Sequence, residues 1–166
     1  MTGLDAATAV PSDVGKNPTD KFECAGRFIE FDLSGRHCLI DAGVVEEVVR
    51  TLNVTPLPFS PTWLLGLAAH RGELVAVIDP AVLFPQAKPG PNARSKMLVF
   101  RKALGQTYFA LPIDLLRKLV TIESGELRLI EPEKTDAITQ AYTSGASEAV
   151  IVSHQKLIES LVCNPL

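Results

Sequence analysis

The pair Arg71-Gly72 is the feature of this sequence whose residue types and spacing best predict a chemical role. The pair separates an apolar segment from a nearly continuous apolar stretch that ends at Asp79, within TWLLGLAAHRGELVAVIDPAVL. Glycine permits a backbone with positive φ, so a turn at this point can carry the arginine out of the core. A planar guanidinium at such a turn is suited to holding a carboxylate or backbone carbonyls in a fixed direction. We therefore predict that Arg71 holds a partner; the alternative is an ordinary hairpin arginine that is solvated and idle.

The other candidates for chemistry do not form a catalytic pattern. The residues that could be drawn as an acid/base cluster are His37, Asp41, Glu46 and Glu47. A surface helix commonly carries such a glutamate pair, however, so the pair alone indicates little. The sequence contains no nucleophile-plus-base motif, phosphate-binding loop or dinucleotide fingerprint. We therefore predict no catalytic residues and no enzymatic activity.

Cysteines and histidines do not fall at metal-ligand spacings. The three cysteines are odd in number and far apart: Cys24, Cys38 and Cys163. This usage indicates a reducing cytoplasm and cysteines that behave as small hydrophobic residues. The three histidines are equally isolated from one another: His37, His70 and His154. We therefore expect neither a metal ion nor another cofactor.

Composition excludes several partner classes. A chain of 166 residues, 46% of them hydrophobic, has room for one globular domain with a sizeable core. The net charge of −3 and the lack of a basic block argue against nucleic-acid binding. No apolar run reaches the ~18–20 residues of a membrane span, so direct membrane insertion is not expected. Residues 1–25 lack the basic start and apolar core of a secretory signal and are predicted to be a flexible polar tail.

The two halves of the chain repeat one pattern. FIEFDLSGRHCLIDAGVVEEVV and LVFRKALGQTYFALPIDLLRKLV each predict a strand, a glycine turn, a second strand and a short helix. Gly35 and Gly105 are 70 positions apart. The short helices are expected over 44–49 and 115–120. Both halves also end alike, with AVIDPAVL in the first and VIVSHQKL in the second.

The strand and loop signals predict a mainly β fold. Alternation predicts a strand over 28–33, and the apolar run over 73–79 is typical of a strand buried on both faces. Prolines make 56–61 an irregular linker and 85–95 a surface loop. Pro112 lacks a backbone donor, which predicts a strand end or an exposed edge. The expected helices are too short to cover a parallel α/β sheet, so two small β-barrels are favoured.

The ordered series of these segments resembles the CheW adaptor domain of bacterial chemotaxis-type signalling, over about Arg27 to Leu161. The motifs that carry the resemblance are FDLSGRHCLI, VVEEVV, VTPLPFSPTWLLGLAAHRGELVAVID, IDLLRKLV and AVIVSHQKLI. The resemblance implies a mainly β domain over 26–163, built from two five-stranded SH3-like barrels with a hydrophobic junction. It also implies that the barrels are interleaved in sequence. The middle barrel would span about 37–85, and the second barrel about 26–36 plus 95–163.

The same resemblance implies a scaffold without catalytic activity. Such an adaptor couples the cytoplasmic tip of a methyl-accepting chemoreceptor to the regulatory domain of a CheA-type histidine kinase. The chain would then lie in the cytoplasm, associated with membrane-bound receptor arrays. The kinase contact is expected on an exposed apolar barrel edge.

Four receptor-contact residues follow from the resemblance. Arg71 stands where the family has the arginine of its Asn-Leu-Arg-Gly turn. Val45 and Glu47 match the valine and glutamate of the family's short helix, and Leu116 falls near an apolar position of the same groove. Receptor tips are helical hairpins, so a helix laid in an apolar groove between the barrels is the predicted mode. Val45, Val48 and Leu116 would line this groove, with Glu47 and Arg71 at its margin; core packing is the alternative for the valines.

One departure from the family pattern bears on the partner more than on the fold. Ala69-His70 replaces the family's Asn-Leu, so that His70 flanks Arg71. This leaves open a CheW-like regulator of a pilus-motility or surface-sensing pathway, or a competitor of the main adaptor.

Overall fold

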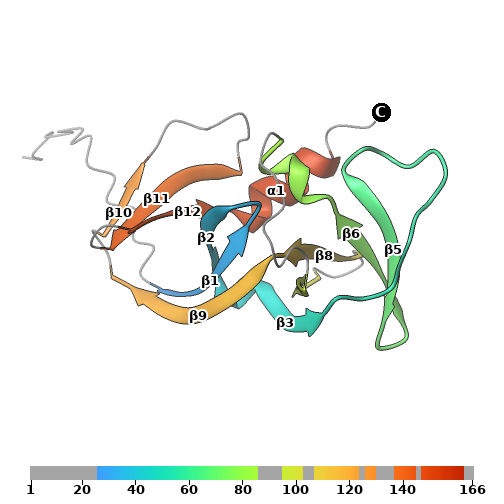
Figure 1. Ribbon diagram of the computed structural model, residues 1–166, viewed down its shortest axis with the longest axis horizontal. Coiled ribbons are helices and arrows are strands. Elements are labelled where there is room, and N and C mark those ends of the chain that lie inside the picture. The colour runs from blue at the N-terminus through green and yellow to red at the C-terminus, as the bar shows by residue number, and fades with distance from the viewer. Residues whose placement is uncertain are drawn as a thin grey trace, which may run out of the picture.

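Two β-sheets form the fold, with short helical segments at their junctions (Figure 1). The computed structural model describes residues 26–85, 95–102, 107–123, 126–129, 137–144 and 147–162. In order across the first sheet lie β10 (Leu127–Leu129), β11 (Ile138–Ser144), β12 (Ser147–Val152), β2 (Arg36–Asp41), β1 (Gly26–Leu33) and β9 (Leu115–Ile122). In order across the second sheet lie β3 (Val45–Arg50), β7 (Lys96–Phe100), β8 (Tyr108–Ile113), β6 (Glu73–Ile78), β5 (Leu64–His70) and β4 (Val54–Thr55). The helical segments are the 3₁₀ helices η1 (Ala42–Val44) and η2 (Pro80–Val82) and the α-helix α1 (His154–Val162).

The mainly β class is confirmed, but the detail of the barrels is not. Each sheet has six strands in the described ranges, with β10 and β9 at the edges of one and β3 and β4 at the edges of the other. No closed barrel is found there. The predicted tail over 1–25 and the centre of the predicted loop, 86–94, lie outside the described residues.

The repeat predicted from the sequence has a structural counterpart in the two strand orders. From one edge to the other, the strand order of the first sheet is β9-β1-β2-β12-β11-β10 and that of the second sheet is β3-β7-β8-β6-β5-β4. In each sheet the second strand of a hairpin pairs with a parallel strand. In the first sheet β2 of the hairpin β1–β2 pairs with β12, and in the second sheet β8 of the hairpin β7–β8 pairs with β6. The hairpin β1–β2 joins the strands of the second half, and the hairpin β7–β8 joins the strands of the first half. The two halves have therefore exchanged their hairpins.

This exchange corrects the expected barrel boundaries. Residues 37–41, expected in the middle unit, lie in β2 beside β1. Strands β7 and β8, expected with the second half, lie in the middle sheet. The physical reason for the first shift is the two-residue turn at Ser34 and Gly35, with φ of 53° and 77°. Such a turn, with both residues left-handed, joins strands that pair directly with each other.

The two short helices expected over 44–49 and 115–120 are strands. The helical part of the first is only the three-residue η1, whose entry is capped by Asp41: its Oδ1 accepts the N–H of Gly43 at 2.7 Å. The β-branched valines that follow fit the pleated surface of β3, which pairs with β7. The second segment is β9, which pairs along β1 and covers what would otherwise be an open edge. Both segments are strands because each pairs with a strand from the other half of the sequence.

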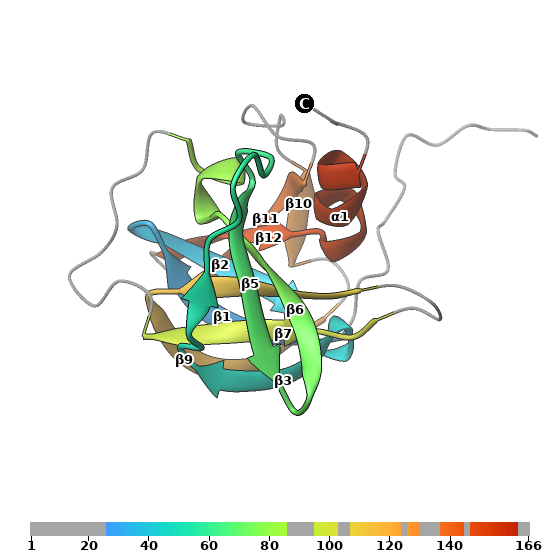
Figure 2. The ribbon, with the colours of Figure 1, turned by 90° about the vertical axis from the view of Figure 1, so that its right-hand side faces the viewer.

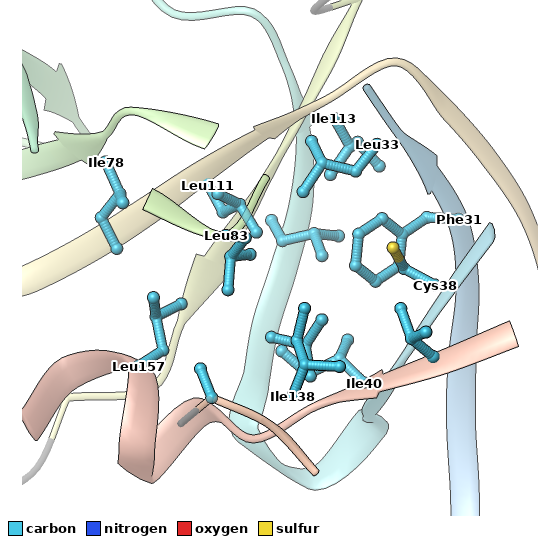
Figure 3. Packing of buried hydrophobic residues seen from close by; sticks show 14 of the residues in the cluster. Phe31, Leu33, Cys38, Ile40, Ile78, Leu83, Leu111, Ile113, Ile138 and Leu157 are labelled. Carbon is cyan, nitrogen blue, oxygen red and sulfur yellow. The ribbon is translucent and has the colours of Figure 1, made fainter. Parts of the chain in front are cut away.

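The main core lies between the two sheets and α1. Figure 3 shows side chains from β1, β2, β6, β8, β11 and α1 pointing toward one another. Phe31, Ile78, Leu111 and Ile113 are fully buried in it, and Leu157 of α1 is nearly so. Burying each such side chain contributes about 1.5–3 kcal/mol, so this cluster fixes one sheet against the other. The hydrophobic junction implied by the resemblance is where this core sits.

Other strand predictions are confirmed in part. The run over 73–79 forms β6, whose residues from Val75 to Ile78 are buried. Pro112 is the next-to-last residue of β8 and lies beyond the last pair with β6, Val77 with Ala110. The predicted strand end is therefore correct, whereas the predicted exposed edge is wrong, because Pro112 is buried in a strand between two neighbours.

Candidate partner-binding site

The predicted turn at Arg71-Gly72 closes the hairpin of β5 and β6. His70 pairs with Glu73 across it, and Arg71 and Gly72 have φ of 52° and 80°. Both central residues are left-handed, which matches the twist of a two-residue hairpin. Glycine adopts this conformation freely, whereas an arginine there costs roughly 1–2 kcal/mol. The Arg71 side chain is 69% exposed, so the turn carries the guanidinium out of the core, as predicted.

The structure brings Arg71 and Glu47 together and adds a third residue, His70. Arg71 Nη2 lies 3.0 Å from Glu47 Oε2, and His70 Nε2 lies 3.1 Å from the same oxygen. A carboxylate only accepts hydrogen bonds, so this contact places a proton on His70 Nε2. We call Glu47, His70 and Arg71 the Glu47 trio.

The trio links two strands that are distant in the second sheet. Glu47 belongs to the edge strand β3, and β7, β8 and β6 lie between it and β5. The curl of the sheet brings the β5–β6 hairpin tip back toward β3, as Figures 1 and 2 both show. A side-chain link therefore spans the open side of the sheet, where no backbone pairing between β3 and β5 is present in the described residues.

The exposure of the trio indicates that it adds little to the stability of the fold. Glu47 is 31% exposed and His70 is 18% exposed, while Arg71 projects furthest into solvent. Exposed ion pairs contribute about 0–1 kcal/mol to folding. Charges at such a rim set the orientation and choice of a partner more than they set affinity.

Val45, the third predicted site residue, does not reach the surface. Its side chain is 5% exposed and belongs to the main core, opposite Phe100 of β7. In a regular strand Val45 and Glu47 would share one face. A β-bulge between them, with Val45 opposite Phe100 and Glu47 opposite Val99, turns Val45 inward and Glu47 outward. The expectation that Val45 lines an exposed groove is thus replaced by the core-packing alternative.

Leu116, the fourth predicted site residue, lies on the other sheet. It is half-buried on β9, opposite Phe31 of β1, and packs against the main core. Val48 is also half-buried against this core. Glu47 and Arg71 are thus in direct contact, whereas Leu116 belongs to a different sheet edge. Its part in partner contact stays a prediction.

The acid/base cluster that could be drawn from the sequence is dispersed in the structure. His37 Nε2 lies 2.6 Å from Glu30 Oε1 on the first sheet, and Asp41 caps η1. Glu47 contacts the hairpin of the second sheet instead. These groups do not converge on one point, so they have no geometry for joint acid/base chemistry.

A second charged group, missed from the sequence, lies on β1 and β9. Arg117 Nε and Nη2 donate to Asp32 Oδ1 and Oδ2 at 2.7 and 2.8 Å, a bidentate pair. The hydrogen bond that Arg117 donates to Asp32 raises the pKa of Arg117. Lys118 Nζ lies 3.9 Å from Glu30 Oε2. The alternation of FIEFDL could have indicated that Glu30 and Asp32 share one face. The register of β9, which brings Arg117 and Lys118 to that face, could not be read from the sequence.

The structure also bears on the cysteines and on possible metal sites and membrane helices. Burial raises the pKa of the Cys38 thiol well above its usual range, so Cys38 behaves as a small hydrophobic residue. Cys24 and Cys163 lie outside the described residues. Within the described ranges, no group of histidine, cysteine, aspartate and glutamate side chains has a geometry that could hold a metal ion. In the same ranges, no helix has the length and hydropathy to cross a membrane.

Comparison with known proteins covers nearly the whole described fold. A family model described as a CheW-like domain matches residues 27–162. Among solved structures, the scaffolding protein TtCheW from Thermoanaerobacter tengcongensis superposes with a TM-score of 0.67 at 19% identity, covering 78% of this chain and 85% of that chain. At that identity the likeness speaks for the fold alone.

A curated relative matches a shorter segment. Protein FrzA from Myxococcus xanthus is 38% identical over 52 residues, which cover 30% of this chain and 32% of FrzA. The match therefore spans about a third of the length of that relative.

Proposed function

Because the chain belongs to the CheW-like domain family, we propose that it is a non-catalytic adaptor coupling a methyl-accepting chemoreceptor to a CheA-type histidine kinase. The receptor would contribute its cytoplasmic tip and the kinase its regulatory domain, in the cytoplasm at membrane-bound arrays. The observation that carries the proposal is the Glu47 trio, which fixes an exposed guanidinium at a hairpin tip. The family match and the scaffold fold support it.

The receptor contact is assigned to the second sheet around the hairpin tip. One nitrogen of Arg71 is engaged by Glu47, and a guanidinium has five N–H donors, so others can reach carbonyl or carboxylate oxygens of a partner helix. Val48, half-buried on β3, supplies apolar surface there, and Val45 supports β3 from the core.

The kinase contact is assigned to the edge strand β9. Leu115 and Leu119 are 42% and 55% exposed there, and within the described residues β9 pairs with β1 alone. An edge with free backbone groups and exposed apolar side chains is suited to pairing with a second β-rich protein. An adaptor needs two separate surfaces, and β9 and the Arg71 hairpin lie on different sheets.

A CheW-like regulator of a surface-sensing pathway, or a competitor of the main adaptor, is the second candidate. The observation that favours it is the contact between His70 and Glu47, made by a residue at which the sequence departs from the family's turn motif. The fold and both surfaces would serve equally in that role. A cell-based assay that replaces the main adaptor with this chain separates the two: restored swimming responses support the adaptor.

The test of the proposed function is the charge reversal Arg71→Glu. The probes are a receptor signalling hairpin in nanodiscs and a purified kinase regulatory domain, both from the organism that encodes this chain. We expect receptor co-sedimentation to fall by about tenfold or more, since the rim charge is reversed, while kinase affinity stays within about twofold.

The matched control is Lys156→Glu on α1. It makes the same change in net charge on an exposed residue, and α1 lies on the side of the molecule away from the hairpin tip in Figures 1 and 2. Receptor binding by this variant should equal that of the unaltered chain. Unchanged receptor binding by Arg71→Glu would remove Arg71 from the mechanism.

A further inference from the structure

His70 holds the carboxylate that Arg71 also contacts. It is the last residue of β5, and its Nε2 lies 3.1 Å from Glu47 Oε2, the oxygen that is also 3.0 Å from Arg71 Nη2. The two donors are consecutive in sequence, yet they differ in environment. His70 is 18% exposed, whereas Arg71 is 69% exposed. The imidazole is therefore the more enclosed partner of Glu47, and the guanidinium is the more exposed one.

This arrangement lets Arg71 exchange its ion pair without leaving Glu47 unpaired. A carboxylate offers about four lone-pair sites, so it can accept from both residues at once. Removing the only partner of a half-buried carboxylate would be costly, because its desolvation is no longer offset. With His70 in place, Arg71 can turn to an acceptor on another protein while Glu47 keeps one hydrogen bond.

We propose that His70 is the positioning residue of this rim: it holds Glu47 so that Arg71 can engage a partner. The inference rests on the proposed function, in which Arg71 contacts the receptor. Without a donor at position 70, Glu47 would depend on Arg71 alone, and Arg71 would be less able to turn to a partner.

The groups facing His70 from neighbouring elements are few. β3 contributes Glu47, and β6 contributes Glu73 directly opposite, whose Oε2 already accepts from Lys102 Nζ at 2.6 Å. The turn contributes Arg71, and the two residues of β4, valine and threonine, carry no charge. The other described histidines are elsewhere: His37 beside Glu30 on the first sheet, and His154 against Phe100.

The test measures affinity for the receptor signalling hairpin at one fixed pH in the unaltered chain, His70→Gln and His70→Leu. His70→Gln keeps an N–H donor at similar reach, so it should retain the affinity of the unaltered chain within about twofold. His70→Leu keeps the size of the side chain but removes the donor, so it should bind the receptor hairpin about threefold or more weakly.

Two controls separate this inference from the proposed function. Kinase affinity should be the same in all three proteins, and thermal melts should show that each variant is folded. If Arg71→Glu weakens receptor binding but His70→Gln binds as weakly as His70→Leu, or His70→Leu binds as the unaltered chain does, only the role of His70 fails. If Arg71→Glu binds the receptor normally, the proposed function fails and the role of His70 fails with it.

Discussion

Swapping the charges of Glu47 and Arg71 separates the ion pair from the partner contact. The single changes Glu47→Arg and Arg71→Glu each place like charges where the atoms are now 3.0 Å apart. The double variant restores opposite charges with reversed polarity. It therefore keeps the attraction between β3 and the hairpin while removing the guanidinium from the hairpin tip.

The structure sets the size of the effect on stability. The pair is 31% and 69% exposed, so solvent screens it strongly, and losing the attraction while gaining repulsion should cost about 1–2 kcal/mol. For a domain of this size, 1 kcal/mol shifts the melting temperature by about 2–4 °C. Each single variant should melt about 2–8 °C lower, and the double variant should recover most of that loss.

Receptor binding should not recover in the double variant. If Arg71 contacts the receptor directly, only a guanidinium at the hairpin tip serves, so Arg71→Glu and the double variant should both bind about tenfold more weakly or worse. Melting is followed by circular dichroism, and binding by titration of the nanodisc-bound receptor hairpin.

Two results would refute this reasoning. Full recovery of receptor binding in the double variant would mean that the link between β3 and the hairpin matters and the arginine itself does not. A fall in melting temperature well beyond about 10 °C in either single variant would make the trio a structural element, because solvent-exposed pairs do not contribute that much.

Three further predictions concern other parts of the molecule. Leu119→Arg on β9 should abolish binding to the kinase regulatory domain in size-exclusion at about tens of micromolar while leaving receptor binding intact. Val162→Arg, at another exposed apolar position on α1, should leave both intact, and kinase binding by the β9 variant would exclude that edge. Gly66→Ala should destabilise the fold by more than about 2 kcal/mol in urea unfolding, because its Cβ would lie 2.3 Å from the Thr55 carbonyl oxygen at a φ of +147°; near-native stability would mean that β4 moves aside freely. Burial lowers the pKa of His154, so the unfolded state binds a proton that the native state does not below about pH 6.5; stability should fall from pH 7.5 to 5.5, and a fall of equal size in His154→Phe would contradict this origin.

The features that local chemistry decides could be predicted from the sequence. Ser34-Gly35 and Arg71-Gly72 each place glycine at a left-handed turn position, and both close two-residue hairpins. Within the run over 73–79, residues 75–78 form the buried part of β6 because β-branched and apolar residues fill it. The repeat could also be predicted from the sequence, since each half contains the same kind of hairpin. Each half also ends with a strand followed by a helix, with Asp79 before η2 and Ser153 before α1.

The features that depend on a distant strand could not be predicted. Residues 44–49 and 115–120 form strands because β7 and β1 lie beside them, and both neighbours come from the opposite half of the sequence. The bulge that turns Val45 inward and Glu47 outward depends on the same pairing. Likewise, the resemblance indicated Glu47 and Arg71 separately, but their contact and the place of His70 required the curl of the sheet.

The exchange of hairpins between the halves bears directly on how an adaptor would work. The first sheet contains the hairpin β1–β2 from the first half of the sequence, and the second sheet contains β7–β8 from the second half. Neither sheet can therefore form from one half of the sequence alone. The main core draws residues from both sheets and from α1, which makes their unfolding cooperative. The Arg71 hairpin and the β9 edge are consequently held in one fixed relation, although they lie on different sheets. A molecule that must place two partners at a set distance, without changing either, requires that kind of rigidity.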